Sequence, residues 1–101
     1  MAFGISKSEL NEWKEKASNG RVSLLTHYWY DPRFPEHRSV TKAGCTDIDI
    51  LIQWGRKYGL KEEWIHQREH FPHFDLLGDR QLRILQAEGK YDHIRRFILK
   101  T

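Results

Sequence analysis

Apolar and charged residues alternate at helical spacing near the start of the chain. Residues 7–18 predict a helix whose apolar positions share one stripe, namely Leu10, Trp13 and Ala17. Ser6 and Glu9, three positions apart, form the capping-box pattern that is typical of a helix start. Gly20 is the kind of residue that ends a helix, so we expect the helix to stop just before it.

A different pattern follows at residues 21–30, where β-branched and aromatic types predominate and indicate a strand. Alternate side chains of a strand point to opposite faces, and here both sets are largely apolar. This favours a strand in the interior of a sheet. Residues 31–36 contain two prolines and predict a loop, and residues 39–42 are compatible with a short second strand.

Helical spacing returns after the loop. Thr46 followed by Asp49 resembles a second helix start, and Gly59 is placed to end that helix. Residues 79–88 predict a third helix, closed by Gly89. Residues 91–101 are compatible with either a helix or a closing strand.

Residues 61–70 admit two interpretations. The segment 64–67 can be a short strand after a tight turn, which we favour because Gly59-Leu60 resembles a common helix-to-strand junction. The alternative is a helix over residues 61–70 that ends before Pro72.

The resulting order of elements predicts an α/β fold, with α+β as the alternative. We expect one domain over residues 1–101, with a mixed, partly parallel sheet of three to four strands packed by about three helices. In parallel sheets, ligands bind beyond the carboxyl ends of the strands. The topology would therefore bring residues 27–31 and 66–75 to the same edge.

Composition supports a small globular protein. The chain has 101 residues, 39% hydrophobic and 31% charged, with 13 aromatic side chains, which excludes a disordered chain. Cys45 is its single cysteine, so no intrachain disulfide can form, as is typical of a reducing compartment. The sequence shows no signal-peptide core and no apolar run of membrane-spanning length, so we expect a cytoplasmic protein without a membrane partner.

The distribution of charge indicates an anionic partner. The formal net charge is +3, and residues 78–101 hold six bases against three acids. Such a small positive region suits a small anionic ligand better than specific recognition of nucleic acid. The alternative is a solvated helix face followed by a basic tail.

Candidate chemistry concentrates between His66 and Asp75, where Pro72 forbids one continuous regular element. His73 and Asp75 are two positions apart, so in an extended segment both side chains point the same way and the carboxylate can orient the imidazole. Alternatively, Asp75 caps the next helix and His73 makes a structural hydrogen bond.

Metal and nucleophile chemistry are weakly indicated. His66 and His70 would share a face only if their segment were helical, and the usual His-Glu-x-x-His spacing is absent. A mixed catalytic metal set of His27, Asp31, His73 and Asp75 is a further possibility, although we assign no metal and no cofactor. Cys45 lies near a predicted helix start, but a small buried side chain is the simpler interpretation.

Part of the chain resembles a small bacterial and phage family of unknown function. The likeness covers about residues 40–90 and rests on Gly59-Leu60, then Trp64, then the His-aromatic-Asp motif at residues 73–75, then a basic helix with Arg80. The resemblance implies a shared α/β fold and no known activity. Leu77 and the lone Asp31 depart from the family pattern.

These observations predict a cytosolic domain that binds a phosphate-bearing, nucleotide-like molecule. We expect the ligand-binding residues to be His27, Asp31, Trp64, His66, His73, Asp75 and Arg80. Arg80 and a helix N-terminus would hold the phosphate, and Trp64 or Tyr28 would form an apolar wall. The alternatives are a metal-assisted or His/Asp acid–base hydrolase, and a protein-interaction module that uses Trp29 or Phe34. The sequence fixes neither the ligand nor the oligomeric state.

Overall fold

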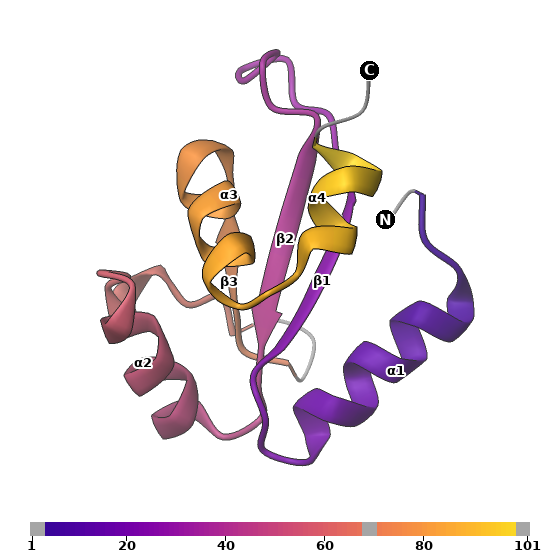
Figure 1. Cartoon of the computed structure of the whole chain (residues 1–101). Helices are drawn as coiled ribbons and strands as arrows, with labels where there is room; N and C mark the ends of the chain where they lie inside the picture. The colour runs from indigo at the N-terminus through magenta and orange to yellow at the C-terminus, as the bar shows by residue number, and fades with distance from the viewer. Residues whose placement is uncertain (1–3, 68–70, 99–101) are drawn as a thin grey trace. The chain divides into compact units, whose positions relative to one another are not determined.

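The structure is a computed structural model that describes residues 4–67 and 71–98. Within these ranges the chain forms four α-helices, one 3₁₀ helix and three strands (Figure 1). In order they are α1 (Lys7–Ser18), β1 (Ser23–Tyr28), β2 (Ser39–Gly44), α2 (Ile48–Lys57), the 3₁₀ helix η1 (Glu62–Trp64), β3 (His73–Leu76), α3 (Gly78–Ala87) and α4 (Tyr91–Phe97). No helix in this part of the chain has the length and apolar run needed to cross a membrane.

The sheet is antiparallel, with strand order β1-β2-β3, so the fold is α+β. The expected partly parallel sheet is therefore wrong. β1 and β2 form a hairpin, because Trp29 donates its backbone N–H to the carbonyl of Arg38 across the loop. Cys45, just after β2, donates its backbone N–H to the carbonyl of Pro72, so β3 starts beside the end of β2. β1 is an edge strand and not the expected interior strand.

The described residues group into two compact units. Unit 1 contains residues 4–5, 26–41 and 76–98, and unit 2 contains residues 6–25, 42–67 and 71–75. The prediction of a single domain over residues 1–101 stays a prediction.

In unit 2, α1 occupies the range that the capping-box pattern indicates. Ser6 and Glu9 exchange side-chain and backbone hydrogen bonds at 3.0 and 3.1 Å. Trp13 and Ala17 are the buried residues of the helix, and the Trp13 ring lies 5.6 Å from that of Phe71. The apolar stripe read from the sequence is thus the face that packs.

The start of α2 differs from the expected one. Asp47 is the N-cap, and its carboxylate accepts from the backbone of the first turn. Thr46 instead donates its hydroxyl to the carbonyl of Ala17 at 2.9 Å. Later in α2, Gly55 has no side chain because the Phe74 ring occupies the space that a Cβ would need.

The favoured strand at residues 64–67 is also wrong. Trp64 donates to the carbonyl of Lys61, and Ile65 to that of Glu62, which closes the turn of η1. Within residues 64–67, only His66 pairs with β3, through an isolated antiparallel bridge to His73. The alternative, a helix over residues 61–70, does not form in residues 61–67. His70 lies outside the described residues.

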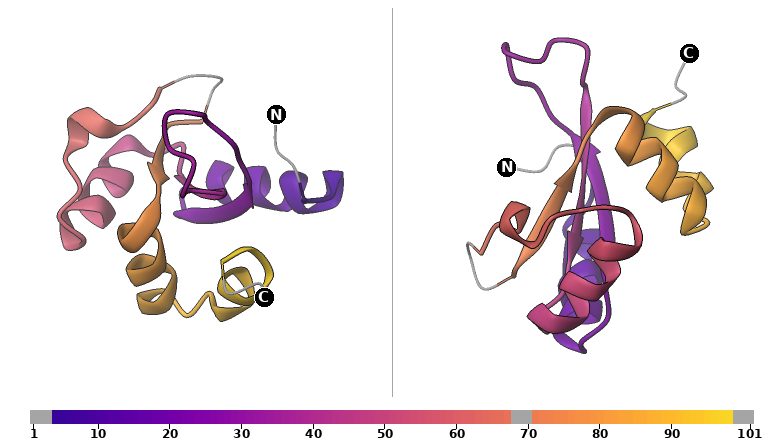
Figure 2. Two further views of the ribbon diagram at one scale, coloured as in Figure 1. Left: turned by 90° about the horizontal axis from the view of Figure 1, so that it is seen from above. Right: turned by 90° about the vertical axis from the view of Figure 1, so that its left-hand side faces the viewer.

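Unit 1 contains the end of β1, the start of β2, and both C-terminal helices, of which α3 contacts α4. The undecided C-terminal segment is a helix, α4, with Ile94 and Phe97 buried. The loop between β1 and β2 extends beyond the ends of the two strands (Figure 2). These elements form the walls of a pocket.

Candidate functional site

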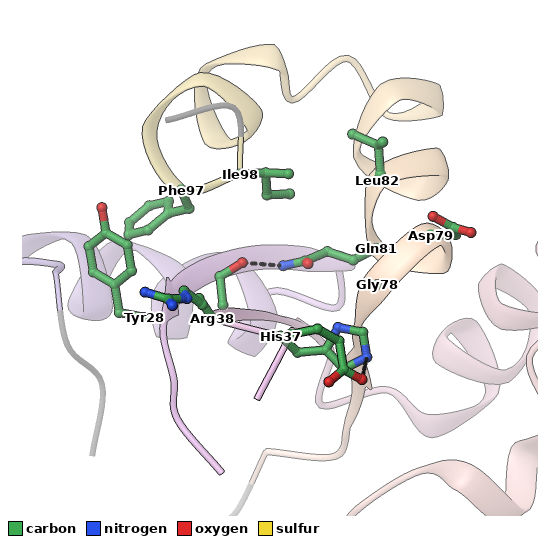
Figure 3. Close-up of a pocket in the computed structure, with 11 residues that line it drawn as sticks. Tyr28, His37, Arg38, Gly78, Asp79, Gln81, Leu82, Phe97 and Ile98 are labelled. Atoms are coloured by element: carbon green, nitrogen blue, oxygen red, sulfur yellow. Dashed lines mark hydrogen bonds and ion pairs between the residues drawn. The ribbon is translucent and has the colours of Figure 1, made fainter. Parts of the chain in front are cut away.

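A pocket of about 580 Å³ lies within unit 1 (Figure 3). Its lining comes from the end of β1, the loop before β2, α3 and the end of α4. The lining residues are Tyr28, Glu36, His37, Arg38, Ser39, Gly78, Asp79, Gln81, Leu82, Phe97 and Ile98. A pocket of this size suits a small organic molecule.

The loop that supplies one wall is held by a local ion pair. The Arg33 guanidinium donates to both carboxylate oxygens of Asp31, and the Arg33 backbone N–H donates to the same carboxylate at 2.9 Å. These hydrogen bonds lower the pKa of Asp31 from its ordinary 3.8 to about 2. Two successive turns follow. Phe34 donates its backbone N–H to the carbonyl of Asp31, and His37 donates to the carbonyl of Phe34, which places His37 in the pocket wall.

The N-terminal end of α3 forms another wall. Leu77 is the N-cap, and its side chain makes no capping hydrogen bond. Gly78 has a φ of +61°, and an added Cβ would lie 3.0 Å from the imidazole of His37. Glycine therefore permits both the turn and the close approach of His37. The Asp79 side chain points away from the other labelled groups (Figure 3).

The apolar side of the pocket is aromatic. The rings of Tyr28 and Phe97 meet edge to face with centroids 4.8 Å apart. Arg38 lies near Tyr28, while Ile98 lies between Phe97 and Leu82 (Figure 3). The Arg38 side chain makes no ion pair with the described residues, which leaves its charge available to a ligand.

A buried amide completes the pocket. Gln81 is 3% exposed and donates from Nε2 to Ser39 Oγ at 3.3 Å and to Thr41 Oγ1 at 3.0 Å. Ser39 and Thr41 are themselves buried. The pocket therefore combines a cation, aromatic rings and a fixed polar group, which is the arrangement found in sites for small polar ligands.

A second polar group lies in unit 2, at the bridge between His66 and His73. His66 Nε2 lies 3.3 Å from one Asp75 oxygen, and His73 Nε2 lies 3.6 Å from the other. The two imidazole rings stack with centroids 5.4 Å apart. His73 Nδ1 lies 2.9 Å from the carbonyl of Phe71, so Nδ1 carries the proton and Nε2 faces the carboxylate.

The structure brings together three of the seven predicted ligand-binding residues, His66, His73 and Asp75, and places none of the seven in the pocket lining. His27 is buried, with Nδ1 against the carbonyl of Tyr28. Trp64 is 40% exposed beneath the Lys61 ammonium. Their binding roles stay predictions. The argument that the two His/Asp groups share one edge fails, because it required a parallel sheet.

Asp31 and Arg80 also lie outside the pocket lining, and their ligand-binding roles stay predictions. Asp31 is engaged by Arg33 within the loop. Arg80 follows Asp79 on α3, is exposed and does not line the pocket. Asp75 does not cap α3, since the N-cap residue is Leu77. The cation that lines the pocket is Arg38, which the sequence reasoning missed.

Among residues 4–67 and 71–98, no group of three or more His, Cys, Asp or Glu side chains is arranged to hold a metal ion. Cys45 is fully buried, as the simpler interpretation expected, and burial raises the pKa of its thiol. A nucleophilic role for Cys45 therefore has no support in this geometry.

The missed residues had weak signals in the sequence. His37 and Arg38 immediately precede β2, and Ser39 is its first residue. Gln81 has no distinctive neighbours in the sequence, and only the fold reveals that it is buried against hydroxyl groups. Contacts between residues about 40 positions apart cannot be read from local spacing.

Comparison with known proteins gives one strong relationship. Over 99 residues the chain is 59% identical to the uncharacterised protein YneQ of Bacillus subtilis (strain 168), a match that covers 98% of this chain and 100% of that relative. No model of a protein family matches the chain, and no solved structure matches it. The motif-based resemblance to a bacterial and phage family stays a prediction.

Proposed function

This chain belongs to the family of the uncharacterised Bacillus subtilis protein YneQ, and from its geometry we propose that the unit 1 pocket binds a small phosphate-bearing, nucleotide-like molecule in the bacterial cytosol. One observation carries the proposal. The pocket combines the guanidinium of Arg38 and the N-terminal end of α3 with the aromatic pair Tyr28 and Phe97. A nucleoside monophosphate offers an anion and a flat ring in one small molecule.

The anionic part of the ligand has three complementary groups. Arg38 provides a guanidinium, which pairs with phosphate through two parallel hydrogen bonds. The backbone N–H groups at the start of α3 provide further donors and the positive end of the helix dipole. His37 lies beside Gly78 at the same place and can donate a hydrogen bond.

Acidic side chains limit the class of anion. Glu36 and Asp79 also line the pocket, so its formal charge is not positive despite Arg38. This balance disfavours a polyphosphate or a nucleic acid strand. Carboxylates accept hydrogen bonds from ribose hydroxyl groups in dinucleotide-binding proteins, so Glu36 suits a ribose monophosphate.

The aromatic part of the ligand would lie against Tyr28 and Phe97. Aromatic side chains stack on nucleobases with little dependence on the base. Gly4 has a φ of +84° and no side chain, so the backbone at this residue packs directly against the rings of Tyr28 and Phe97. The Arg96 guanidinium donates to the Gly4 carbonyl and fixes this segment.

An NMR titration of the ¹⁵N-labelled protein with adenosine 5′-monophosphate (AMP) tests the proposal. We expect backbone amide shifts at residues 36–39, 78–82 and 97–98. Arg38→Gln should weaken AMP binding about tenfold, since it removes a charge-assisted hydrogen bond. Arg83→Gln removes the same charge from an exposed position of α3 outside the pocket and should change affinity less than about twofold. Equal losses in both variants, or no amide shifts at millimolar AMP, would contradict it.

The group of His66, His73 and Asp75 favours a second candidate, acid–base catalysis of hydrolysis. The His73 tautomer is set by the Phe71 carbonyl, so the nitrogen that faces Asp75 is the one able to exchange a proton. His66 is 48% exposed and accessible to a substrate. If this candidate is correct, bis(p-nitrophenyl) phosphate is turned over and His73→Ala abolishes the activity while His37→Ala retains it. Activity unchanged in His73→Ala would exclude it.

A further inference from the structure

A continuous chain of buried polar groups runs from the pocket to α4. Its first step is the Gln81 amide, which donates to Ser39 and Thr41. Thr41 Oγ1 lies 2.7 Å from Thr26 Oγ1, and Thr26 Oγ1 lies 2.8 Å from His93 Nδ1. Thr26 and Thr41 are 1% and 0% exposed, so water does not substitute for these partners.

The direction of this chain follows from the two hydrogen bonds that Gln81 Nε2 donates. Gln81 Nε2 uses its two hydrogens on Ser39 and Thr41. Thr41 then gives its own hydrogen to Thr26, and Thr26 gives its hydrogen to His93 Nδ1. In the opposite direction, Thr41 would accept twice, and its own hydrogen would have no acceptor among the described residues. A buried hydroxyl without an acceptor is unfavourable, so the first direction holds when Gln81 Nε2 is the donor.

The same two hydrogen bonds determine which atom Gln81 presents to the pocket. Both amide hydrogens point to the buried hydroxyls, and the amide oxygen accepts no hydrogen bond from the described residues. Gln81 nevertheless lines the pocket and is 3% exposed, so its oxygen is a fixed acceptor at the wall (Figure 3). An amide held in this way cannot rotate without breaking two hydrogen bonds.

We infer that Gln81 is a specificity-determining residue that requires a hydrogen-bond donor, an N–H or O–H group, on the ligand. His93 is a positioning residue, because its unprotonated Nδ1 receives the last hydrogen of the chain and so keeps the Gln81 oxygen toward the pocket. The inference rests on the proposed function and adds a requirement to it. A site built to accept a hydrogen bond rejects an analogue that lacks the donor, since the buried acceptor is then left unpaired.

The first experiment compares AMP with three analogues that each lack one donor: purine riboside 5′-monophosphate, 2′-deoxyAMP and 3′-deoxyAMP. For the wild-type chain, we expect one of them to bind about tenfold more weakly than AMP. In Gln81→Met that analogue and AMP should bind alike, because the acceptor is gone. If every analogue binds as AMP does, or if the loss persists in Gln81→Met, the inference is overturned.

The second experiment needs no ligand. The imidazole ¹⁵N shifts of His93 at pH 8 report which ring nitrogen carries the proton, and we expect Nδ1 to be unprotonated. Thr26→Val removes the donor to Nδ1 without altering the pocket lining and should move that shift toward the value of free imidazole. A protonated Nδ1 in the wild-type chain would reverse the hydrogen-bond chain and overturn the inference.

The two experiments separate this inference from the proposed function. Absence of AMP binding by the wild-type chain would reject the nucleotide-like ligand, while an unprotonated His93 Nδ1 would still support the orientation of Gln81. Conversely, AMP binding with a protonated Nδ1 would retain the proposed function and reject the inference. The second experiment also stands if Gln81→Met does not fold.

Discussion

The indole N–H of Trp13 donates to the backbone carbonyl of Ser23 at 2.8 Å, at a position where both residues are buried. This hydrogen bond ties α1 to the first residue of β1 within unit 2. Gly44 lies against the same ring, and an added Cβ would approach Trp13 Cζ2 to 2.5 Å. The Trp13 side chain of α1 therefore contacts both the start of β1 and the backbone at Gly44.

Trp13→Phe should lower the free energy of unfolding by about 1–3 kcal/mol, because the buried Ser23 carbonyl loses its donor while an aromatic ring remains. Urea unfolding followed by circular dichroism measures the loss. Trp29→Phe is the matched control, since the Trp29 indole donates no hydrogen bond to the described residues. Equal losses in the two variants would show that ring size, and not the hydrogen bond, matters.

Gly55→Ala should destabilise unit 2 although alanine is the better helix former. The new methyl would lie 2.6 Å from the Phe74 ring, and an overpacked core loses about 1–3 kcal/mol. Gln53→Ala, at an exposed position of α2, should be close to neutral. Combining Gly55→Ala with Phe74→Leu should cost less than the sum of the single variants, and strict additivity would contradict the proposed clash.

Gly78→Ala and Gly89→Ala separate backbone strain from ligand binding. Both glycines have positive φ, +61° and +73°, so each alanine should cost about 1 kcal/mol of stability. Only Gly78 adjoins His37, whereas nothing lies within 4 Å of a Cβ at Gly89. We therefore expect Gly78→Ala alone to weaken AMP binding in a titration. Equal affinities of the two variants would argue against a role for His37.

The loop that carries His37 and Arg38 should lose its ion pair only in strong acid. The Asp31 pKa is lowered to about 2 by Arg33, so the stabilisation is complete above the ordinary value of 3.8 and is lost as the pH falls through 2. The Asp31 carboxyl ¹³C shift should titrate near pH 2, and in Arg33→Gln near pH 4. A wild-type midpoint near 4 would mean that the ion pair does not form in solution.

Local patterns predicted the helices better than the sheet. The Ser6 and Glu9 capping box and the glycines at 59 and 89 mark helix ends through contacts between near neighbours, and these marks correspond to α1, α2 and α3. The direction of β3 depends instead on contacts between residues far apart in the sequence. One of them is the hydrogen bond from Cys45 to Pro72, which has no periodic signature.

The candidate site was less predictable than the fold. His73 and Asp75 were paired from their spacing because both belong to one short strand. The pocket, in contrast, requires α3 to bring Gln81 to Ser39 and Thr41 from about 40 residues away. Arg38 was not predicted to line a site. Nothing in the sequence shows that Asp31 pairs with Arg33 and not with Arg38.

The complete burial of Cys45 makes the chain's single thiol a reporter of conformational opening. A thiol reagent reacts with the thiolate of an accessible cysteine, and in the folded chain both burial and the raised thiol pKa suppress that reaction. The ratio of its labelling rate in the intact chain to that in an unfolded peptide therefore measures the fraction of time that unit 2 is open around β2. The native Cys45 thiol therefore reports local unfolding without an engineered label.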